Sequence, residues 1–218
     1  MRGTENEIFD TYQLLPTKTA LIVVDVQNDF CHDEGIFSKN KKVDLDHVQQ
    51  AVTTLLSFIE ICRRFNLPTI FVRTIHSAWT DSPSWLGRMR GAAEKMRICP
   101  PGSWGADFYK VTPTEADCVI SKHRYSAFVG TDLDLILRSG GIENILLAGV
   151  VTNVCVETTA RDGFNLNYNV IMVEDCCGAY DHGEHAATLN NISKYFGRVA
   201  TCRTLIEILE KQKKSKSG

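Results

Sequence analysis

The sequence predicts an α/β domain with a doubly wound, mostly parallel sheet and helices on both faces. Short apolar runs of strand length alternate with longer amphipathic segments along the 218 residues, and this alternation is typical of repeated strand–helix units. The length suits one domain with a full-sized core. We find no internal repeat or linker, so we expect a single domain over residues 1–218, with a frayed tail at 213–218.

The first half of the chain supplies strands and one long helix. Strands are predicted at 20–25, 69–73 and 118–120, where apolar and β-branched residues follow one another. Residues 44–65 place apolar side chains at spacings of three and four, which indicates an amphipathic helix. Asp44 or Asp46 is available to cap it.

The second half continues the alternation with shorter elements. We expect helices at 132–139, 156–167, 184–195 and 203–211, and strands at 145–148, 170–173 and near Val199.

One long connection, residues 75–114, breaks the pattern. It has little periodicity and contains Trp79, Trp85 and Trp104. Loops of this length in a compact domain usually cover a site or form an interface. We therefore expect it to wall a pocket, although aromatic loops also serve simply as core or interface.

Composition and charge disfavour several classes of partner. The net charge of −2 gives no sign of binding to nucleic acid or an anionic membrane. No apolar run approaches the roughly 18 residues of a spanning helix, and residues 1–10 lack the apolar core of a signal peptide. We expect a cytoplasmic protein with a small-molecule substrate.

Eight cysteines are scattered along the chain without a CxxC pair. Disulfide frameworks are typical of short secreted chains, so we interpret these residues as free thiols, several of them buried, in a reducing compartment. Cys176 and Cys177 are adjacent and follow a predicted strand, which argues against a zinc ribbon.

Cys155 stands where a strand ends and a helix begins. Backbone N–H groups at a helix start carry partial positive charge, which favours a thiolate and lowers the pKa of a thiol held there. Such turns at the carboxyl end of a parallel sheet are where α/β proteins place their sites. Cys155 is therefore a candidate nucleophile, and the alternative is a buried structural cysteine.

Two further apolar strands lead into reactive side chains, Asp25 and Lys122. If the three strands are parallel neighbours, their carboxyl ends bring together an acid, an amine and a thiol. The carboxylate can then take the thiol proton while the ammonium stabilises both anions. Taken alone, Asp25 could anchor a loop and Lys122 could be a solvated surface residue, so convergence is what favours catalysis.

Three motifs carry a family resemblance. They are Ala20-Leu-Ile-Val-Val-Asp-Val-Gln-Asn-Asp-Phe30, Lys122-His-Arg-Tyr-Ser-Ala-Phe128 and Gly149-Val-Val-Thr-Asn-Val-Cys-Val156. Together they resemble the isochorismatase-like cysteine hydrolases over residues 15–205. The resemblance implies an Asp-Lys-Cys triad, with Asp25 as general base and later acid, Lys122 as electrostatic partner and Cys155 as nucleophile.

The resemblance also implies a cis peptide at Val150–Val151 and an oxyanion hole formed by the N–H groups of Val151 and Cys155. Relatives are commonly dimers or tetramers, so it implies a homo-oligomer. Nicotinamidases in this superfamily bind a metal through an Asp-x-His and a second His. His32 and His76 do not reproduce that set, so we expect no catalytic metal and no cofactor.

The branch of the family is indicated by longer runs. The Lys122 motif and residues 152–164 look closest to ureidoacrylate amidohydrolases, whereas residues 174–185 are similar to biuret hydrolases. Both act on a ureido or carbamoyl group. Tyr125, one helical turn beyond Lys122, is the candidate for substrate contact. Arg124 either binds a substrate carboxylate or forms a structural pair, for which the candidates are Asp132 and Asp134.

The leading hypothesis is a cofactor-free cysteine amidohydrolase that cleaves a C–N bond through a covalent thioester. An isochorismatase-type vinyl-ether hydrolase is an alternative, and the presence of Cys155 with both partners argues against it. A non-catalytic binding member of the fold is a third possibility, and the complete triad disfavours it.

Overall fold

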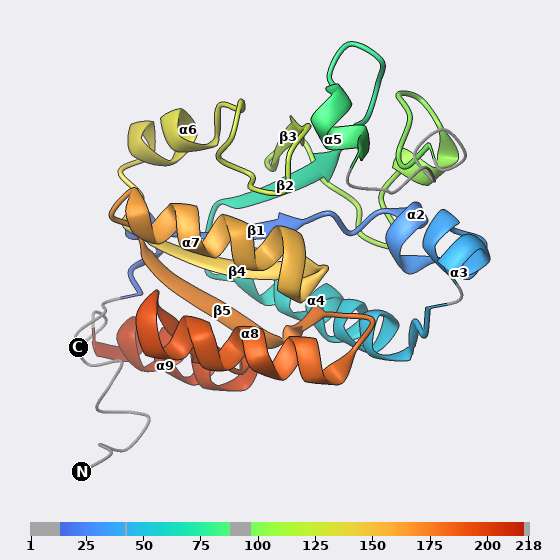
Figure 1. Ribbon diagram of the computed structural model, residues 1–218. Helices are drawn as coiled ribbons and strands as arrows, with labels where there is room; N and C mark the ends of the chain where they lie inside the picture. Colours follow the sequence, from blue (N-terminus) through green and yellow to red (C-terminus); the bar gives the residue numbers. More distant parts are fainter. Residues whose placement is uncertain (1–13, 42, 88–96, 216–218) are drawn as a thin grey trace.

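The computed structural model describes residues 14–41, 43–87 and 97–215 and contains a six-stranded sheet between two layers of helices (Figure 1). All strand pairs are parallel, in the order β3-β2-β1-β4-β5-β6. The strands are β1 (Thr19–Val24), β2 (Thr69–Thr74), β3 (Cys118–Lys122), β4 (Asn144–Val150), β5 (Asn169–Gly178) and β6 (Arg198–Ala200). The predicted doubly wound class is confirmed.

Two hydrophobic clusters hold the layers together, because the strands alternate their side chains between the faces. Leu21 and Val23 of β1 pack on one face with α4 (Asp46–Arg64) and α9 (Cys202–Ser215). Ile22 and Val24 pack on the other. That second face is covered by α6 (Leu133–Ser139), α7 (Glu157–Asn165) and α8 (His182–Tyr195).

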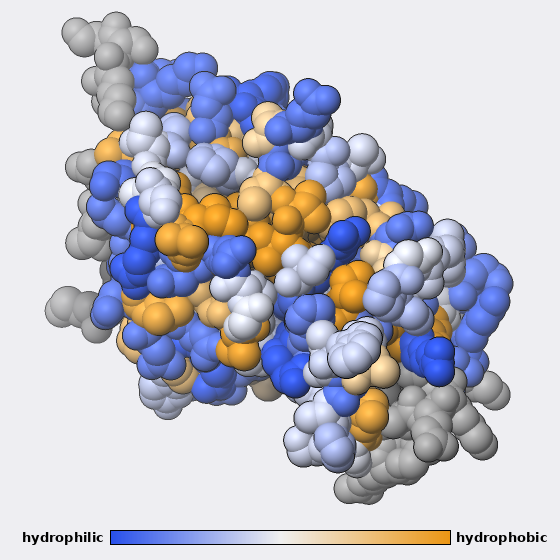
Figure 2. Space-filling model, turned by 90° about the horizontal axis from the view of Figure 1, so that it is seen from above, coloured by the Kyte–Doolittle hydropathy of each residue, from blue (hydrophilic) through white to orange (hydrophobic). Residues whose placement is uncertain are grey.

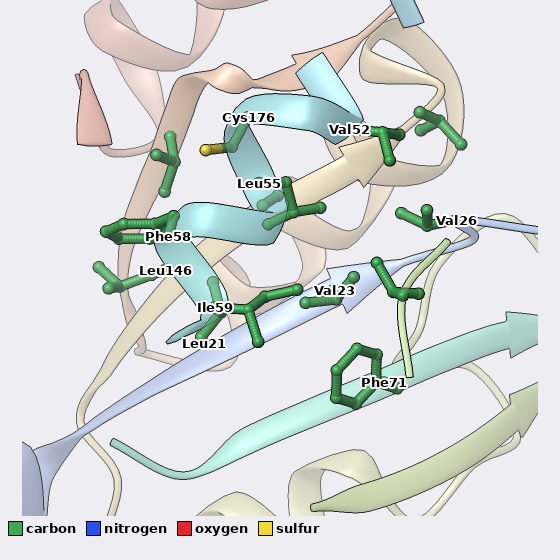
Figure 3. Packing of buried hydrophobic residues seen from close by; sticks show 14 of the residues in the cluster. Leu21, Val23, Val26, Val52, Leu55, Phe58, Ile59, Phe71, Leu146 and Cys176 are labelled. Carbon is green, nitrogen blue, oxygen red and sulfur yellow. The ribbon is translucent and has the colours of Figure 1, made fainter. Parts of the chain in front are cut away.

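Helix α4 shows how the sequence pattern becomes packing. Its apolar residues at spacings of three and four point at the sheet, where Val52, Leu55 and Ile59 join the hydrophobic cluster that also contains Leu21, Val23 and Leu146 (Figure 3). Asp44 accepts a hydrogen bond from the Asp46 N–H at 2.8 Å, so it satisfies one of the unpaired donors of the first turn. The predicted helix and its N-terminal acceptor are both present.

Several short elements escaped prediction. These are α2 (Asn28–Cys31), α3 (Ile36–Lys41), α5 (Pro83–Gly87), the 3₁₀ turns Pro16–Lys18 and Trp104–Ala106, and the π-helical turn Thr152–Val156. Each of these elements has three to six residues, which is too short for a helical period to be recognised in the sequence.

Three expectations about elements are wrong. β5 continues to Gly178, so Cys176 and Cys177 lie within the strand and do not follow it. Residues 123–130 are turns and bends, so Tyr125 lies on a loop, not one helical turn beyond Lys122. Helix α9 continues to Ser215, so the predicted frayed tail is wrong for residues 213–215; residues 216–218 lie outside the described part.

The surface is mixed in character. Hydrophobic patches alternate with hydrophilic ones on the face seen in Figure 2, and Trp79 and Leu135 are among the exposed large apolar residues. None of the helices within the described ranges is long and apolar enough to cross a membrane.

Candidate active site

The carboxyl ends of three strands bring the candidate side chains together. Asp25 directly follows β1, Lys122 ends β3, and Cys155 lies in the π-helical turn after β4. All three are buried, Cys155 with 7% of its surface exposed, and the Cys155 thiol interacts electrostatically with both partners. The strands are not all neighbours as expected, because β2 lies between β1 and β3.

Thr74, the last residue of β2, fills the gap between the acid and the amine. Lys122 Nζ lies 2.7 Å from Asp25 Oδ2 and donates to Thr74 Oγ1 at 2.7 Å. The Thr74 hydroxyl in turn donates to Asp25 Oδ1 at 3.0 Å. Sequence reasoning missed Thr74, although it ends an apolar strand just as the other site residues do.

The electrostatics of the cluster follow from burial and charge. Burial works to lower the pKa of Lys122, but Asp25 and then Cys155 outweigh it and raise that pKa, so the amine is an ammonium. Burial raises the pKa of the Cys155 thiol far above its ordinary value, with Lys122 opposing and Asp25 adding to the effect. The expected lowering of the thiol pKa is therefore wrong, because desolvation of the anion exceeds the effect of the helix start.

The polar residues of the first motif hold the site's loops. Gln27 accepts from the Thr74 N–H at 2.7 Å and donates to the carbonyl oxygens of Thr74 and Ala106 at 2.9 and 2.8 Å. Asn28 donates to the Trp104 carbonyl at 2.8 Å. The motif thus ties the end of β2 and the long loop to the turn that carries Asp25.

The backbone around Cys155 has two special features. Gly149 has φ of 118°, and a Cβ there would lie 2.1 Å from the Val24 carbonyl oxygen, so only glycine lets β4 approach β1 at this point. The Val150–Val151 peptide is cis, as the resemblance implied. The Val151 carbonyl accepts from the N–H groups of Val154 and Val156 at 3.1 and 3.4 Å, which shapes the turn that carries the thiol.

A cavity of about 330 Å³ opens onto Cys155 and Lys122. The residues that line it come from both sides of the sheet's carboxyl edge. They are Phe30, Phe37, Thr74, His76, Trp85, Ile98, Lys122, Arg124, Tyr125, Val151, Asn153, Val154, Cys155, Tyr180 and Glu184. Asn153, Tyr180 and Glu184 are further residues that sequence reasoning missed, since nothing in their local pattern distinguishes them.

Arg124 and Tyr125 both line this cavity. The Arg124 guanidinium donates to the carbonyl oxygens of Thr80 and His123 at 3.0 and 2.6 Å and lies 5.0 Å from the Trp85 ring centre. The alternative of a structural pair is wrong, because Asp134 bonds Arg138 and Tyr168 instead. No carboxylate of the described ranges forms an ion pair with Arg124.

The long loop contributes selectively to the cavity wall. Trp85 lines the cavity and its ring lies 4.8 Å from that of Tyr125, whereas Trp79 is 97% exposed. His76 lines the cavity and bonds Asp81 at 2.8 Å. His32 lies apart, with its ring against Trp104 and Tyr109.

Comparison with known proteins identifies relatives of this chain. The chain is 32% identical to the ureidoacrylate amidohydrolase RutB of Acinetobacter baylyi, covering 92% of this chain and 87% of that protein. Among solved structures it resembles a cysteine hydrolase from Pseudomonas syringae pv. phaseolicola, with TM-score 0.81, 27% identity and coverage of 92% and 96%.

A second solved structure, the N-carbamoylsarcosine amidase from Thermoplasma acidophilum, has TM-score 0.68 and 32% identity, covering 85% of this chain and 96% of that one. The model of the isochorismatase domain matches residues 19–204, which include all three candidate side chains. The chain therefore belongs to the isochorismatase family of hydrolases.

Proposed function

We propose that this protein is a cysteine-dependent amidohydrolase that cleaves a C–N bond of a small ureido or carbamoyl compound. The observation that carries the proposal is the buried 2.7 Å ion pair of Lys122 and Asp25 beside the Cys155 thiol, at the wall of a cavity of small-molecule size. Isolated charges are costly to bury, and this pair provides the base and the cation that a thiol nucleophile needs.

The first half of the reaction forms a thioester. Asp25 removes the proton of Cys155, and the thiolate attacks the carbonyl carbon, forming a C–S bond. The tetrahedral intermediate then breaks its C–N bond, and the protonated Asp25 gives its proton to the leaving nitrogen. Ammonia or an amine departs, and Lys122 remains an ammonium throughout, stabilising first the carboxylate and then the thiolate.

The second half restores the enzyme. Asp25 removes a proton from water, whose oxygen attacks the thioester carbonyl. The C–S bond breaks and the thiolate regains the proton from Asp25. In both halves the N–H groups of Val151 and Cys155 would bind the oxyanion. Loss of one such donor typically lowers the rate about 100-fold or more.

The substrate class rests on the cavity and on the relatives. Among the residues that the structure describes, no carboxylate pairs with the Arg124 guanidinium, which suits an acid such as a ureidoacrylate. Glu184 and Asn153, joined at 2.7 Å, line the same cavity and could accept and donate hydrogen bonds to a ureido group. Tyr125 would contact the substrate beside Trp85.

We further propose that the reaction uses neither a metal nor another cofactor, and that the protein acts as a cytoplasmic homo-oligomer. Purified enzyme that loses ammonia release when stoichiometric zinc or iron is removed, and regains it on reconstitution, would contradict the first part. Size-exclusion chromatography with light scattering tests the second.

The primary test is ammonia release from a panel of ureidoacrylate-like acids, biuret, N-carbamoyl amino acids, nicotinamide and simple amides. Release from one ureide that disappears in Cys155→Ala and persists in Cys118→Ala supports the proposal. Intact-mass analysis with a slow substrate should reveal a covalent adduct on Cys155. Full activity in Cys155→Ala, or an adduct on another cysteine, would refute the mechanism.

A further inference from the structure

A second group of reactive side chains lies away from the cavity, between β5 and α9. One potential ligand atom each from Asp175, Cys176 and Cys202 lies within 4.8 Å of the other two. The thiols of Cys176 and Cys202 also interact electrostatically with each other. None of the three lines the cavity described above, so the amidohydrolase mechanism does not use them.

An irregularity in β5 brings these side chains together. Leu147 of β4 pairs with Met172 of β5, and the next pair along the two strands is Gly149 with Cys177. Between these two pairs β4 moves on by two residues and β5 by five. β5 therefore carries three additional residues, and Asp175 and Cys176 are among them. Adjacent residues of a regular strand point to opposite faces, whereas this bulge lets both contribute to one cluster. Bulges of this kind are commonly functional features.

Capping of α9 explains part of the arrangement. Asp175 Oδ1 accepts from the Cys202 N–H at 2.8 Å, at the first residue of α9. The second oxygen, Oδ2, accepts from the Cys202 thiol at 3.0 Å. A helix cap needs only one carboxylate oxygen and no thiol. Capping therefore does not explain why the second oxygen of Asp175 and the thiols of Cys176 and Cys202 lie together.

We propose that Asp175 Oδ2, Cys176 Sγ and Cys202 Sγ form a binding site for a thiophilic divalent cation of the zinc class. Zinc takes Cys and Asp ligands at about 2.0–2.3 Å, and two sulfurs on one tetrahedral zinc are about 3.8 Å apart. The present separations of at most 4.8 Å can contract to that value through small side-chain rotations. The cation would tie the carboxyl end of β5 to α9.

The surroundings favour a structural site with one open position. Cys176 is 1% exposed, and its sulfur lies in the hydrophobic cluster beneath α4 (Figure 3). Cys202 is only partly buried, which gives the ion an entry path and room for a water ligand. The Cys62 thiol of α4 influences both cysteines electrostatically but lies outside the three-residue cluster.

Cation binding must displace the thiol protons. The affinity is therefore expected to rise with pH, since protons and the cation compete for the same sulfurs.

The experiment uses Cd²⁺ as a spectroscopic probe and Zn²⁺ for calorimetry, with the catalytic thiol removed as Cys155→Ala and a phosphine reductant present. We expect one equivalent of Cd²⁺ to bind with thiolate-to-cadmium charge-transfer absorbance. Adding Cys202→Ser or Cys176→Ala should lower the affinity at least about tenfold. The matched control, Cys118→Ser, changes a partly buried thiol on β3 and should leave binding unchanged.

Two further measurements distinguish loss of the binding site from misfolding of a variant. In the Cys155→Ala protein, Zn²⁺ should slow alkylation of Cys202 and raise the thermal midpoint, and it should not raise the midpoint of the Cys202→Ser form. Absence of stoichiometric binding to Cys155→Ala, or an affinity that Cys202→Ser leaves unchanged, would overturn the proposal. Neither result depends on ammonia release, so this site and the proposed reaction fail or stand separately.

Discussion

The ammonium of Lys122 lies 2.7 Å from the carboxylate of Asp25, and each side chain is only 1% exposed. Neither charge is accessible to bulk water, so each depends on the other for stabilisation. The same contact keeps an anionic base beside a thiol that burial holds protonated. Stability and proposed chemistry therefore rest on one ion pair.

Replacing Lys122 with methionine should destabilise the fold strongly. Removing one partner of a buried pair leaves an uncompensated charge and typically costs about 3–5 kcal/mol. The free energy of unfolding, measured in urea, should fall by that amount. Lys18→Met is the matched control: its pair with Glu143 has the same 2.7 Å separation, but both side chains are well exposed, so it should cost at most about 1 kcal/mol. Equal losses in the two variants would contradict the interpretation.

Thr74→Val should lower the catalytic rate without removing any charge. The variant keeps the shape of the side chain but loses the hydroxyl that bonds both Lys122 and Asp25. A hydrogen bond to a charged group contributes about 1.5–3 kcal/mol, so kcat/KM should fall roughly 10- to 100-fold. Thr74→Ser restores the hydroxyl and should recover most of the activity. A valine variant with unchanged kcat/KM would show that Thr74 has no positioning role.

The side chains at the strand ends were the part of the site that could be predicted from the sequence. Short, continuous apolar runs located the strands β1, β3 and β4. Because repeated strand–helix units form parallel sheets, the carboxyl ends of these strands were expected to bring Asp25, Lys122 and Cys155 together. Strand order is a long-range property, however, and no local pattern places β2 between β1 and β3. Thr74 was missed for that reason.

Two local backbone irregularities were not predicted. The π-helical turn of Cys155 and the bulge in β5 depend on pairing between distant segments, which periodicity does not display. The expected low thiol pKa failed similarly, because it considered the helix start and not the burial of Cys155. Arg124 was left with two alternatives because its partner ring, Trp85, lies on a distant loop.

The alkylation of Cys155 should respond to pH as expected for a buried thiol. Burial raises its pKa, so the thiolate fraction of the free enzyme is small at neutral pH and increases as pH rises. The rate of iodoacetamide labelling, mapped to Cys155 by mass spectrometry, should keep rising beyond pH 9, the ordinary value for this group. A plateau reached near neutral pH would instead show a preformed thiolate.

Protonation of His185 should lower the free energy of unfolding in mild acid. Burial, followed by His47 and His182, lowers its pKa from 6.5 to about 4, so the unfolded chain binds this proton more readily than the folded one. Stability is therefore lost as pH falls from 6.5 to 4. Because its ring also bonds the Thr152 hydroxyl at 3.0 Å, the variant should be His185→Asn. Its unfolding free energy should depend less on pH in this window; an identical pH dependence would exclude His185.

Arg124→Ala should separate charged from neutral substrates. If the guanidinium binds a substrate carboxylate, its loss removes a charge-assisted contact, and KM for a ureido acid should rise about tenfold or more, as a loss of about 1.5–3 kcal/mol predicts. Biuret has no carboxylate, so its kcat/KM should change little. The control is Arg138→Ala, whose guanidinium pairs with Asp134 away from the cavity. If Arg124→Ala lowers kcat/KM equally for acidic and neutral substrates, Arg124 does not bind the carboxylate. It would then act by positioning the Trp85 ring at the cavity wall, since its guanidinium lies over that ring.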